Sequence, residues 1–152
     1  MYRARLLPSV ISRCIASRDP LMLKVLHHIA AQDDADIKGC FREHYERLVV
    51  LLQQTQESDT DAFVEVLSIL SNLHFPEYDF PGLLRRHNLL AVLLSIVQQC
   101  GEGFMDEDVL LEVAGLVGSI CHHPGTAQLI TESGLVRGLY FGVPSFPCWL
   151  LS

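Results

Sequence analysis

The chain has 152 residues, which is enough for one domain of ordinary size. Apolar residues make up 49% and charged residues 19%, a composition typical of a folded chain and not of a disordered one. The formal net charge of −7 disfavours nucleic-acid binding through a general attraction to phosphates. The longest nearly unbroken apolar run, Leu89 to Val97, has less than half of the roughly 20 residues that a membrane-spanning helix needs. We therefore expect neither nucleic-acid binding nor membrane insertion.

The cysteines are scattered and their number is odd. No CxxC pair occurs among the five, so the pattern argues against a disulfide framework and favours a reducing compartment. They are Cys14, Cys40, Cys100, Cys121 and Cys148.

Residues 1–18 are rich in arginine and serine and contain no acidic residue before Asp19. Such an N-terminus fits either a mitochondrial presequence or an ordinary basic amphipathic helix, and the second interpretation is favoured.

The first half of the chain predicts amphipathic helices. Asp19 and Pro20 form a helix start, because the carboxylate can cap free N–H groups and proline suits the first helical position. Polar residues 32–36 predict a turn, and Ser58 to Asp61 opens a further helix that stops near Pro76. The apolar positions expected on one buried face are Met22, Val25, Leu26 and Ile29 in the first of these helices, Phe41, Leu48, Leu51 and Leu52 in the next, and Val66, Ile69, Leu70 and Leu73 in the third.

The second half continues the same pattern. Pro81 starts a short helix that Asn88 breaks before the apolar run 89–97. The acidic residues 106–108 suit the N-terminus of another helix, which Pro124-Gly125 ends. The apolar face of that helix consists of Val113, Leu116, Val117 and Ile120. No strand-type alternation is sustained, so the sequence predicts an all-α fold.

These helical patterns repeat along the chain. The apolar positions of the helix after Pro20 recur at an offset of 44 and again after a further 47 residues, and the short helices recur at 46. Asn88 and Gly134 occupy the same slot, where a left-handed residue ends a helix. Periods of this length, built from one short and two longer helices, are typical of armadillo or HEAT arrays.

We accordingly expect an armadillo-type α-solenoid, a right-handed superhelix with two full repeats flanked by partial ones. The boundaries are a partial repeat over 1–32, repeats over 37–76 and 79–123, a partial repeat over 126–141 and an irregular tail over 142–152. Because about three repeats are needed to close a solenoid core, we expect a piece of a longer array that aggregates or dimerises alone.

No pattern in the sequence predicts catalysis, a cofactor, a metal site or a small-molecule substrate. Residues 34–39 resemble the start of a calcium loop, but Lys38 and Tyr45 stand where carboxylates are required, which favours a turn. Cys121 and His122 point in different directions on a helix, so they cannot easily share a zinc ion. His27 and His28 fit a helix C-terminus.

A protein-binding groove is the functional surface that the repeats predict. If the apolar stripes are buried, the opposite helix faces line up in a stack as a groove that binds a partner, the alternative being that these faces are simply solvated. Leu21 is the first residue of the first of these faces. The candidate partner-binding residues are Lys24, His28, Glu65, Ser68, Asn72, Glu112, Gly115 and Ser119.

Several segments resemble the kinesin-associated protein family. The first of them is Arg18-Asp-Pro-Leu-Met and the last is Leu129-Ile-Thr-Glu-Ser-Gly-Leu-Val, and the likeness as a whole covers about residues 6–141. The more distinctive ones are Phe75-Pro-Glu-Tyr-Asp-Phe and Asp106-Glu-Asp-Val-Leu-Leu-Glu-Val-Ala-Gly-Leu-Val-Gly. Phe63-Val-Glu-Val-Leu-Ser-Ile-Leu-Ser-Asn-Leu is similar as well, whereas the tail from Gly142 onward does not match.

The resemblance implies an armadillo-repeat, non-motor subunit of heterotrimeric kinesin-II, with no catalytic residues. It implies binding to the tails of the two motor subunits and to cargo adaptors, in the cytoplasm, on microtubules and in cilia or flagella. It also places residues 1–18 inside a repeat and not in a presequence. The alternative is a generic armadillo scaffold that serves another complex.

Overall fold

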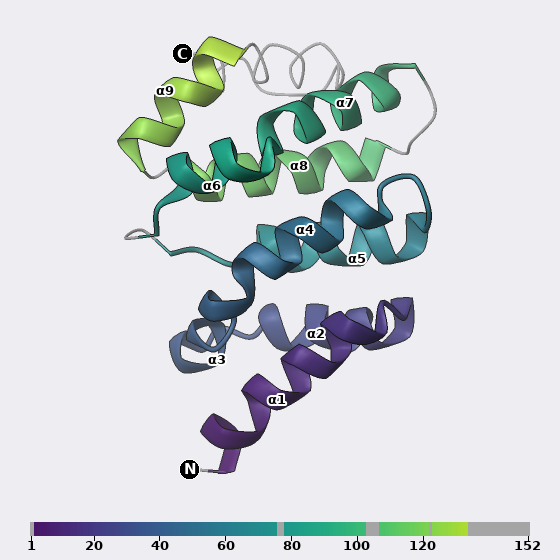
Figure 1. Ribbon diagram of the computed structural model, residues 1–152, viewed down its shortest axis with the longest axis vertical. Coiled ribbons are helices and arrows are strands. Elements are labelled where there is room, and N and C mark those ends of the chain that lie inside the picture. Colours follow the sequence, from purple (N-terminus) through teal and green to yellow (C-terminus); the bar gives the residue numbers. More distant parts are fainter. Residues whose placement is uncertain (1, 76–77, 103–106, 122, 134–152) are drawn as a thin grey trace. The chain divides into compact units, whose positions relative to one another are not determined.

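The structure, a computed structural model, describes residues 2–75, 78–102, 107–121 and 123–133 (Figure 1). Within these ranges every regular element is a helix, which confirms the all-α prediction and is consistent with an α-solenoid. The elements are α1 (Tyr2–Ser17), α2 (Pro20–Ala30), α3 (Ala35–Gly39), the 3-10 helix η1 (Arg42–His44), α4 (Tyr45–Thr55), α5 (Thr60–Ser71), α6 (Phe80–His87), α7 (Leu89–Gly101), α8 (Glu107–Ile120) and α9 (Pro124–Ser133).

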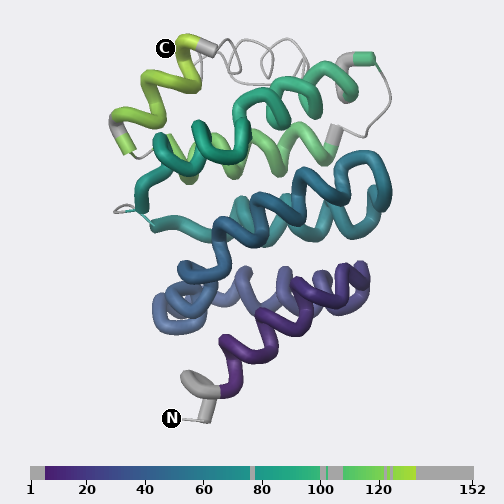
Figure 2. The backbone as a smooth tube through the Cα atoms, viewed as in Figure 1, coloured from purple at the N-terminus to yellow at the C-terminus, as the bar shows by residue number. Residues whose placement is uncertain are grey.

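The chain divides into two compact units, Met1–Phe75 and Pro76–Ser152, which we call unit 1 and unit 2. Unit 1 contains two long helix pairs, and each helix of one pair packs on its counterpart in the other. Helix α2 packs along α5, and α1 contacts α4, while α3 joins the pairs beside α2 (Figures 1 and 2). This pairwise packing of the helices of unit 1 is consistent with an α-solenoid.

Aspartate side chains start several of these helices. Asp19 Oδ1 accepts a hydrogen bond from Leu21 N at 2.9 Å, with Pro20 in the first helical position, as predicted. Asp59 Oδ1 accepts from Ala62 N at 3.1 Å and begins α5, which ends at Ser71, before Pro76. These local predictions are confirmed because a cap needs only residues within one helical turn.

The buried face of α2 differs from the prediction. Leu23, Leu26 and Ala30 are fully buried, whereas Met22 is 41% and Val25 is 49% exposed. The predicted stripe is therefore wrong at these two positions. Helix α2 is apolar on two sides, and the side chains on Leu23's side fill the core.

Equivalent positions of α2 and α5 in the structure are 40 residues apart in the sequence and not 44. The capping residues Asp19 and Asp59 are 40 positions apart. The same shift places the buried residues Leu23, Leu26 and Ala30 on Phe63, Val66 and Leu70, all fully buried. It also aligns two side-chain hydrogen bonds to the backbone, Gln32 Nε2 to His28 O at 3.2 Å and Asn72 Nδ2 to Ser68 O at 2.8 Å.

Unit 2 consists of α6 to α9, in which α7 packs on α8, and α9 contacts α6 and α8. Asn88 between α6 and α7 has φ 52° and ψ 39°, which confirms the predicted left-handed residue. The predicted buried positions Val113, Leu116, Val117 and Ile120 of α8 are all buried. Helix α8 ends at Ile120, and Pro124 and Gly125 begin α9.

Among the described residues, no single helix is long and apolar enough to cross a membrane, although the pair Phe80–His87 and Leu89–Gln99, bent by 72°, reaches the length and composition together. Some predicted features lie outside the described residues: Asp106, His122, Gly134, the end of the partial repeat 126–141 and the predicted tail over 142–152.

Candidate functional site

The predicted turn at Asp34 is a helix cap. Its Oδ1 accepts hydrogen bonds from Asp36 N at 2.9 Å and Ile37 N at 3.2 Å, which begins α3. An oxygen held by two backbone N–H groups is acting as a helix cap in this structure. Across the described residues, no group of three or more His, Cys, Asp or Glu side chains is arranged to hold a metal ion.

Two cysteines have thiols that are poorly suited to nucleophilic chemistry. Burial raises the pKa of the Cys14 thiol and of the Cys121 thiol, so the reactive thiolate is disfavoured at both sites.

The predicted groove residues of unit 1 fall into two groups. Lys24 and His28 lie one turn apart on α2 and are both exposed. Ser68 is only 4% exposed, so the prediction that it lies on an open face is wrong. Asn72 is half-buried, and its side-chain amide donates a hydrogen bond to the Ser68 carbonyl oxygen. Less of the amide's hydrogen-bonding capacity is therefore available to a partner. Helix α5 is enclosed on more sides than the repeat pattern indicated.

Glu65, the remaining groove residue of unit 1, contacts α2. Its Oε2 lies 3.1 Å from His27 Nδ1, and both side chains are largely covered. The His27 ring also stacks on His28, with ring centroids 5.5 Å apart. The role of Glu65 that is visible in the structure is thus to join two stacked helices.

The groove residues of unit 2 lie on one face of α8. Gly115 is exposed, and Glu112 and Ser119 are half-buried. Leu111 on the same helix is 56% exposed, so part of this surface is apolar.

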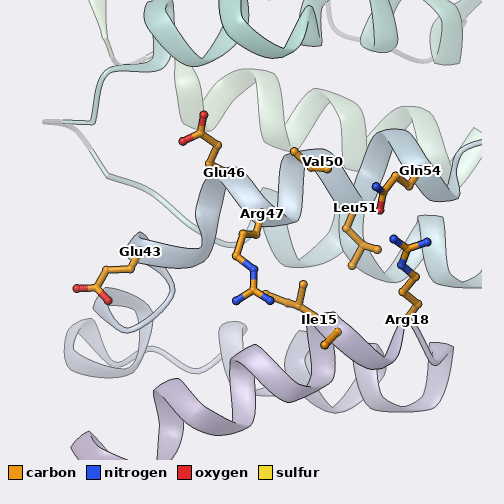
Figure 3. A pocket seen from close by; sticks show the side chains of 9 residues that line it. Ile15, Arg18, Glu43, Glu46, Arg47, Val50, Leu51 and Gln54 are labelled. Carbon is orange, nitrogen blue, oxygen red and sulfur yellow. The ribbon is translucent and has the colours of Figure 1, made fainter.

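A cavity of about 500 Å³ lies in unit 1 between α1 and α4 (Figure 3). The apolar lining of the cavity consists of Ile15, Val50 and Leu51, and charged side chains lie along α4. Glu43 and Glu46 lie toward its N-terminal end, and Gln54 lies toward its C-terminal end near Arg18 (Figure 3).

Arg47 crosses this cavity from α4 to α1. Its Nη1 donates to Ser12 Oγ at 3.0 Å and to His44 Nδ1 at 3.3 Å. Burial lowers the pKa of His44, and the charge of Arg47 lowers it further, against a smaller raising effect of Glu43. Neutral His44 is therefore the form that accepts the hydrogen bond from Arg47.

No pattern in the sequence predicts this cavity. Arg18, which lines the cavity, follows α1 with φ 57°. A left-handed residue other than glycine or asparagine costs about 1 kcal/mol, so an arginine there is unusual. How far α1 and α4 separate depends on packing, which no local pattern encodes.

The kinesin-associated protein family matches residues 1–141, which includes all of α1. No solved structure matches the chain. Since the match covers nearly the whole sequence and every described helix, this chain belongs to the kinesin-associated protein family.

Proposed function

We propose that this chain is a non-catalytic adaptor that binds the motor subunits of kinesin-II and links them to cargo adaptors. The observation that carries the proposal is the family match over residues 1–141. Poorly reactive thiols and a fold made of stacked helices support a binding role over an enzymatic one.

We further propose an armadillo-type right-handed solenoid with repeats over 37–76 and 79–123 and partial repeats over 1–32 and 126–141. The succession of one short and two long helices, α3–α4–α5 and then α6–α7–α8, supports it. The packing of α1 on α4 and of α2 on α5 supports it as well. The boundary of the compact units after Phe75 falls close to a proposed repeat boundary.

We propose that the partner-binding surface consists of the predicted groove residues that are exposed and of their neighbours. In unit 1 it consists of Lys24 and His28, and in unit 2 it is centred on Gly115 with Glu112 and Ser119 beside it. The class of partner is protein, and the expected location is the cytoplasm, on microtubules and in cilia or flagella.

A capture experiment with the coiled-coil tails of the two kinesin-II motor subunits tests this function. The purified chain should retain at least one tail, while the tail of a motor outside kinesin-II should not be retained. Lys24→Glu combined with His28→Ala should weaken retention without lowering the melting temperature, because both side chains are exposed. Failure of a correctly folded chain to retain either kinesin-II tail would refute the proposal and favour a scaffold of another complex.

A further inference from the structure

The cavity between α1 and α4, which we call the α1–α4 cavity, is lined by two arginines whose charges are not neutralised. Its volume of about 500 Å³ lies within the range of about 300–1,000 Å³ that is typical of ligand sites. In the part of the chain that the structure describes, Arg18 makes no hydrogen bond or ion pair. Arg47 donates to Ser12 and His44, which are neutral groups. Two positive charges at this cavity are therefore available to an anion.

The acidic residues at the cavity do not face these charges. Glu43 and Glu46 lie toward the N-terminal end of α4, and both side chains point away from the space between α1 and α4 (Figure 3). Arg47 points from α4 toward α1, and Arg18 points from the end of α1 toward α4 (Figure 3). The part of the cavity between the two arginines thus has an excess of positive charge.

The backbone at Arg18 is fixed from both sides. Ser17 Oγ donates to the Cys14 carbonyl oxygen at 2.7 Å and accepts from Asp19 N at 3.2 Å. Asp19 Oδ1 in turn accepts from Leu21 N and begins α2. These contacts hold Arg18 in the left-handed conformation with φ 57°, which disfavours arginine. Backbone strain of this kind is concentrated at functional sites, and here it fixes the position from which the guanidinium enters the cavity.

Accessible apolar surface lies between the two arginines. Ala16 is exposed and Val50 is half-buried, so part of each side chain can contact a ligand. Val50 follows Arg47 by one turn of α4, and Gln54 follows Val50 by a further turn. Gln54 lies beside Arg18 (Figure 3). Because seven residues of helix rise about 10 Å, the two cations are roughly that far apart along α4, with apolar surface midway.

We propose that the α1–α4 cavity binds an extended segment of a partner protein in which an apolar residue lies between two acidic ones, each two positions away. In an extended segment these three side chains share one face, and the acidic residues are about 13 Å apart. The flexible glutamate and arginine side chains span the remaining difference. A helical segment is disfavoured, because two turns of helix fill about 800 Å³, which is more than the cavity holds.

The inference deepens the proposed adaptor function by adding a second surface and the chemistry of the segment that it takes. It rests on that function only for the existence of a protein partner. A peptide is favoured over a membrane, since the accessible apolar side chains Ala16 and Val50 are too small to anchor these helices in lipid.

A fluorescence anisotropy titration of the whole chain tests the proposal. The probe is a labelled peptide with the sequence Gly-Ser-Glu-Ser-Leu-Ser-Glu-Ser-Gly. A second probe has glutamine in place of both glutamates, and a third has serine in place of leucine. The acidic probe should bind at least tenfold more tightly than the glutamine probe, and its affinity should fall as salt is added, because the contacts are ionic. The probe without leucine should bind several-fold more weakly, because it buries less apolar surface.

Arg18→Gly separates binding from folding. The variant removes one cation, so the affinity for the acidic probe should fall about tenfold. Glycine adopts φ 57° without strain, so the melting temperature should stay the same or rise. Arg47→Gln should weaken binding by a similar factor, while it keeps a donor for Ser12. Arg13→Gln is the matched control, because Arg13 is exposed on α1 and is not among the residues that line the cavity. It removes the same charge and should leave the affinity unchanged.

Several results would overturn the proposal. They are failure of the acidic probe to bind, equal affinities for the acidic probe and either of the other two, and equal losses of affinity in Arg13→Gln and Arg18→Gly. Binding to phosphatidylserine vesicles that Arg18→Gly abolishes, without binding of the acidic probe, would make a membrane the occupant. Since no motor tail is used, failure of tail capture would refute the proposed function and leave this result unaffected.

Discussion

Glu65 Oε2 of α5 lies 3.1 Å from His27 Nδ1 of α2, and this contact joins the two stacked helices of unit 1. The pair is partly exposed, so its contribution to the free energy of unfolding is about 0.2–1 kcal/mol. We expect a double-mutant cycle with His27→Ala and Glu65→Ala to give a coupling energy in this range. Urea unfolding of the four proteins measures it. A coupling energy of zero would mean that the two side chains stabilise unit 1 independently.

Lys38 fastens α3 to the C-terminal end of α5. Its Nζ donates to the Asn72 carbonyl oxygen at 2.9 Å, where the negative end of the helix dipole favours a cation. Lys38→Met should lower the free energy of unfolding by about 1–2 kcal/mol, because the hydrogen bond involves a charged group. Lys24→Met is the matched control, since Lys24 is exposed, and it should change stability by less than about 0.5 kcal/mol. Equal effects of the two substitutions would contradict this role for Lys38.

His44 makes unit 1 sensitive to mild acid. Its pKa is lower in the folded chain than the ordinary value of 6.5, chiefly because it is partly buried. The unfolded chain therefore binds the proton more readily, so this stabilisation is complete above pH 6.5 and is lost as the pH falls toward the folded pKa. His44→Gln keeps an acceptor for Arg47 but does not titrate.

We expect the melting temperature of the wild-type chain to fall further between pH 7.5 and 5.5 than that of His44→Gln. The two proteins differ only at residue 44, so the difference between their curves isolates His44. Parallel curves over this range would show that His44 does not contribute to the acid sensitivity.

Thr126 carries a fully buried hydroxyl near the start of α9. Within the described part of the chain, its Oγ1 has no hydrogen-bond partner. A buried polar group without a partner costs about 1–3 kcal/mol, so Thr126→Val should raise the free energy of unfolding by about 1 kcal/mol. Thr131→Val, on the exposed side of α9, should raise it by much less. Destabilisation by Thr126→Val would indicate that the hydroxyl has a partner.

Asn88 allows the chain to turn from α6 into α7 with its φ of 52°. Asn88→Ala should lower the free energy of unfolding by about 1 kcal/mol, because alanine is disfavoured in the left-handed region. Asn88→Gly should preserve or increase stability, since glycine adopts this conformation without strain. Thermal melting compares the three proteins, and an alanine variant as stable as the glycine variant would count against the backbone argument.

The sequence predicts the features of this fold that depend on neighbours in the chain. The caps at Asp19 and Asp59 and the left-handed Asn88 are of this kind, because one helical turn contains all the groups involved. The buried face of α2 could not be predicted in the same way. Both the stripe with Met22 and the one with Leu23 have helical spacing, and only packing against α1 and α5 decides between them.

The candidate site was harder to predict for a related reason. Lys24 and His28 are exposed, as expected. Ser68 is polar and yet buried, because helix α5 is covered on several sides. The cavity beside Arg47 depends on the separation of α1 and α4, which is a property of two elements far apart in the sequence.

The enclosure of α5 has a consequence for how such a chain can diversify over evolutionary time. Buried residues occupy almost every turn of this helix, from Ala62 to Leu70. A substitution there must be matched by compensating changes in α2 or α4, so the helix has little freedom to drift. The outward sides of α1 and α2 are free of that constraint. New binding specificities in descendants of this chain should therefore arise at exposed positions such as those of α1 and α2, while the sequence of α5 changes slowly.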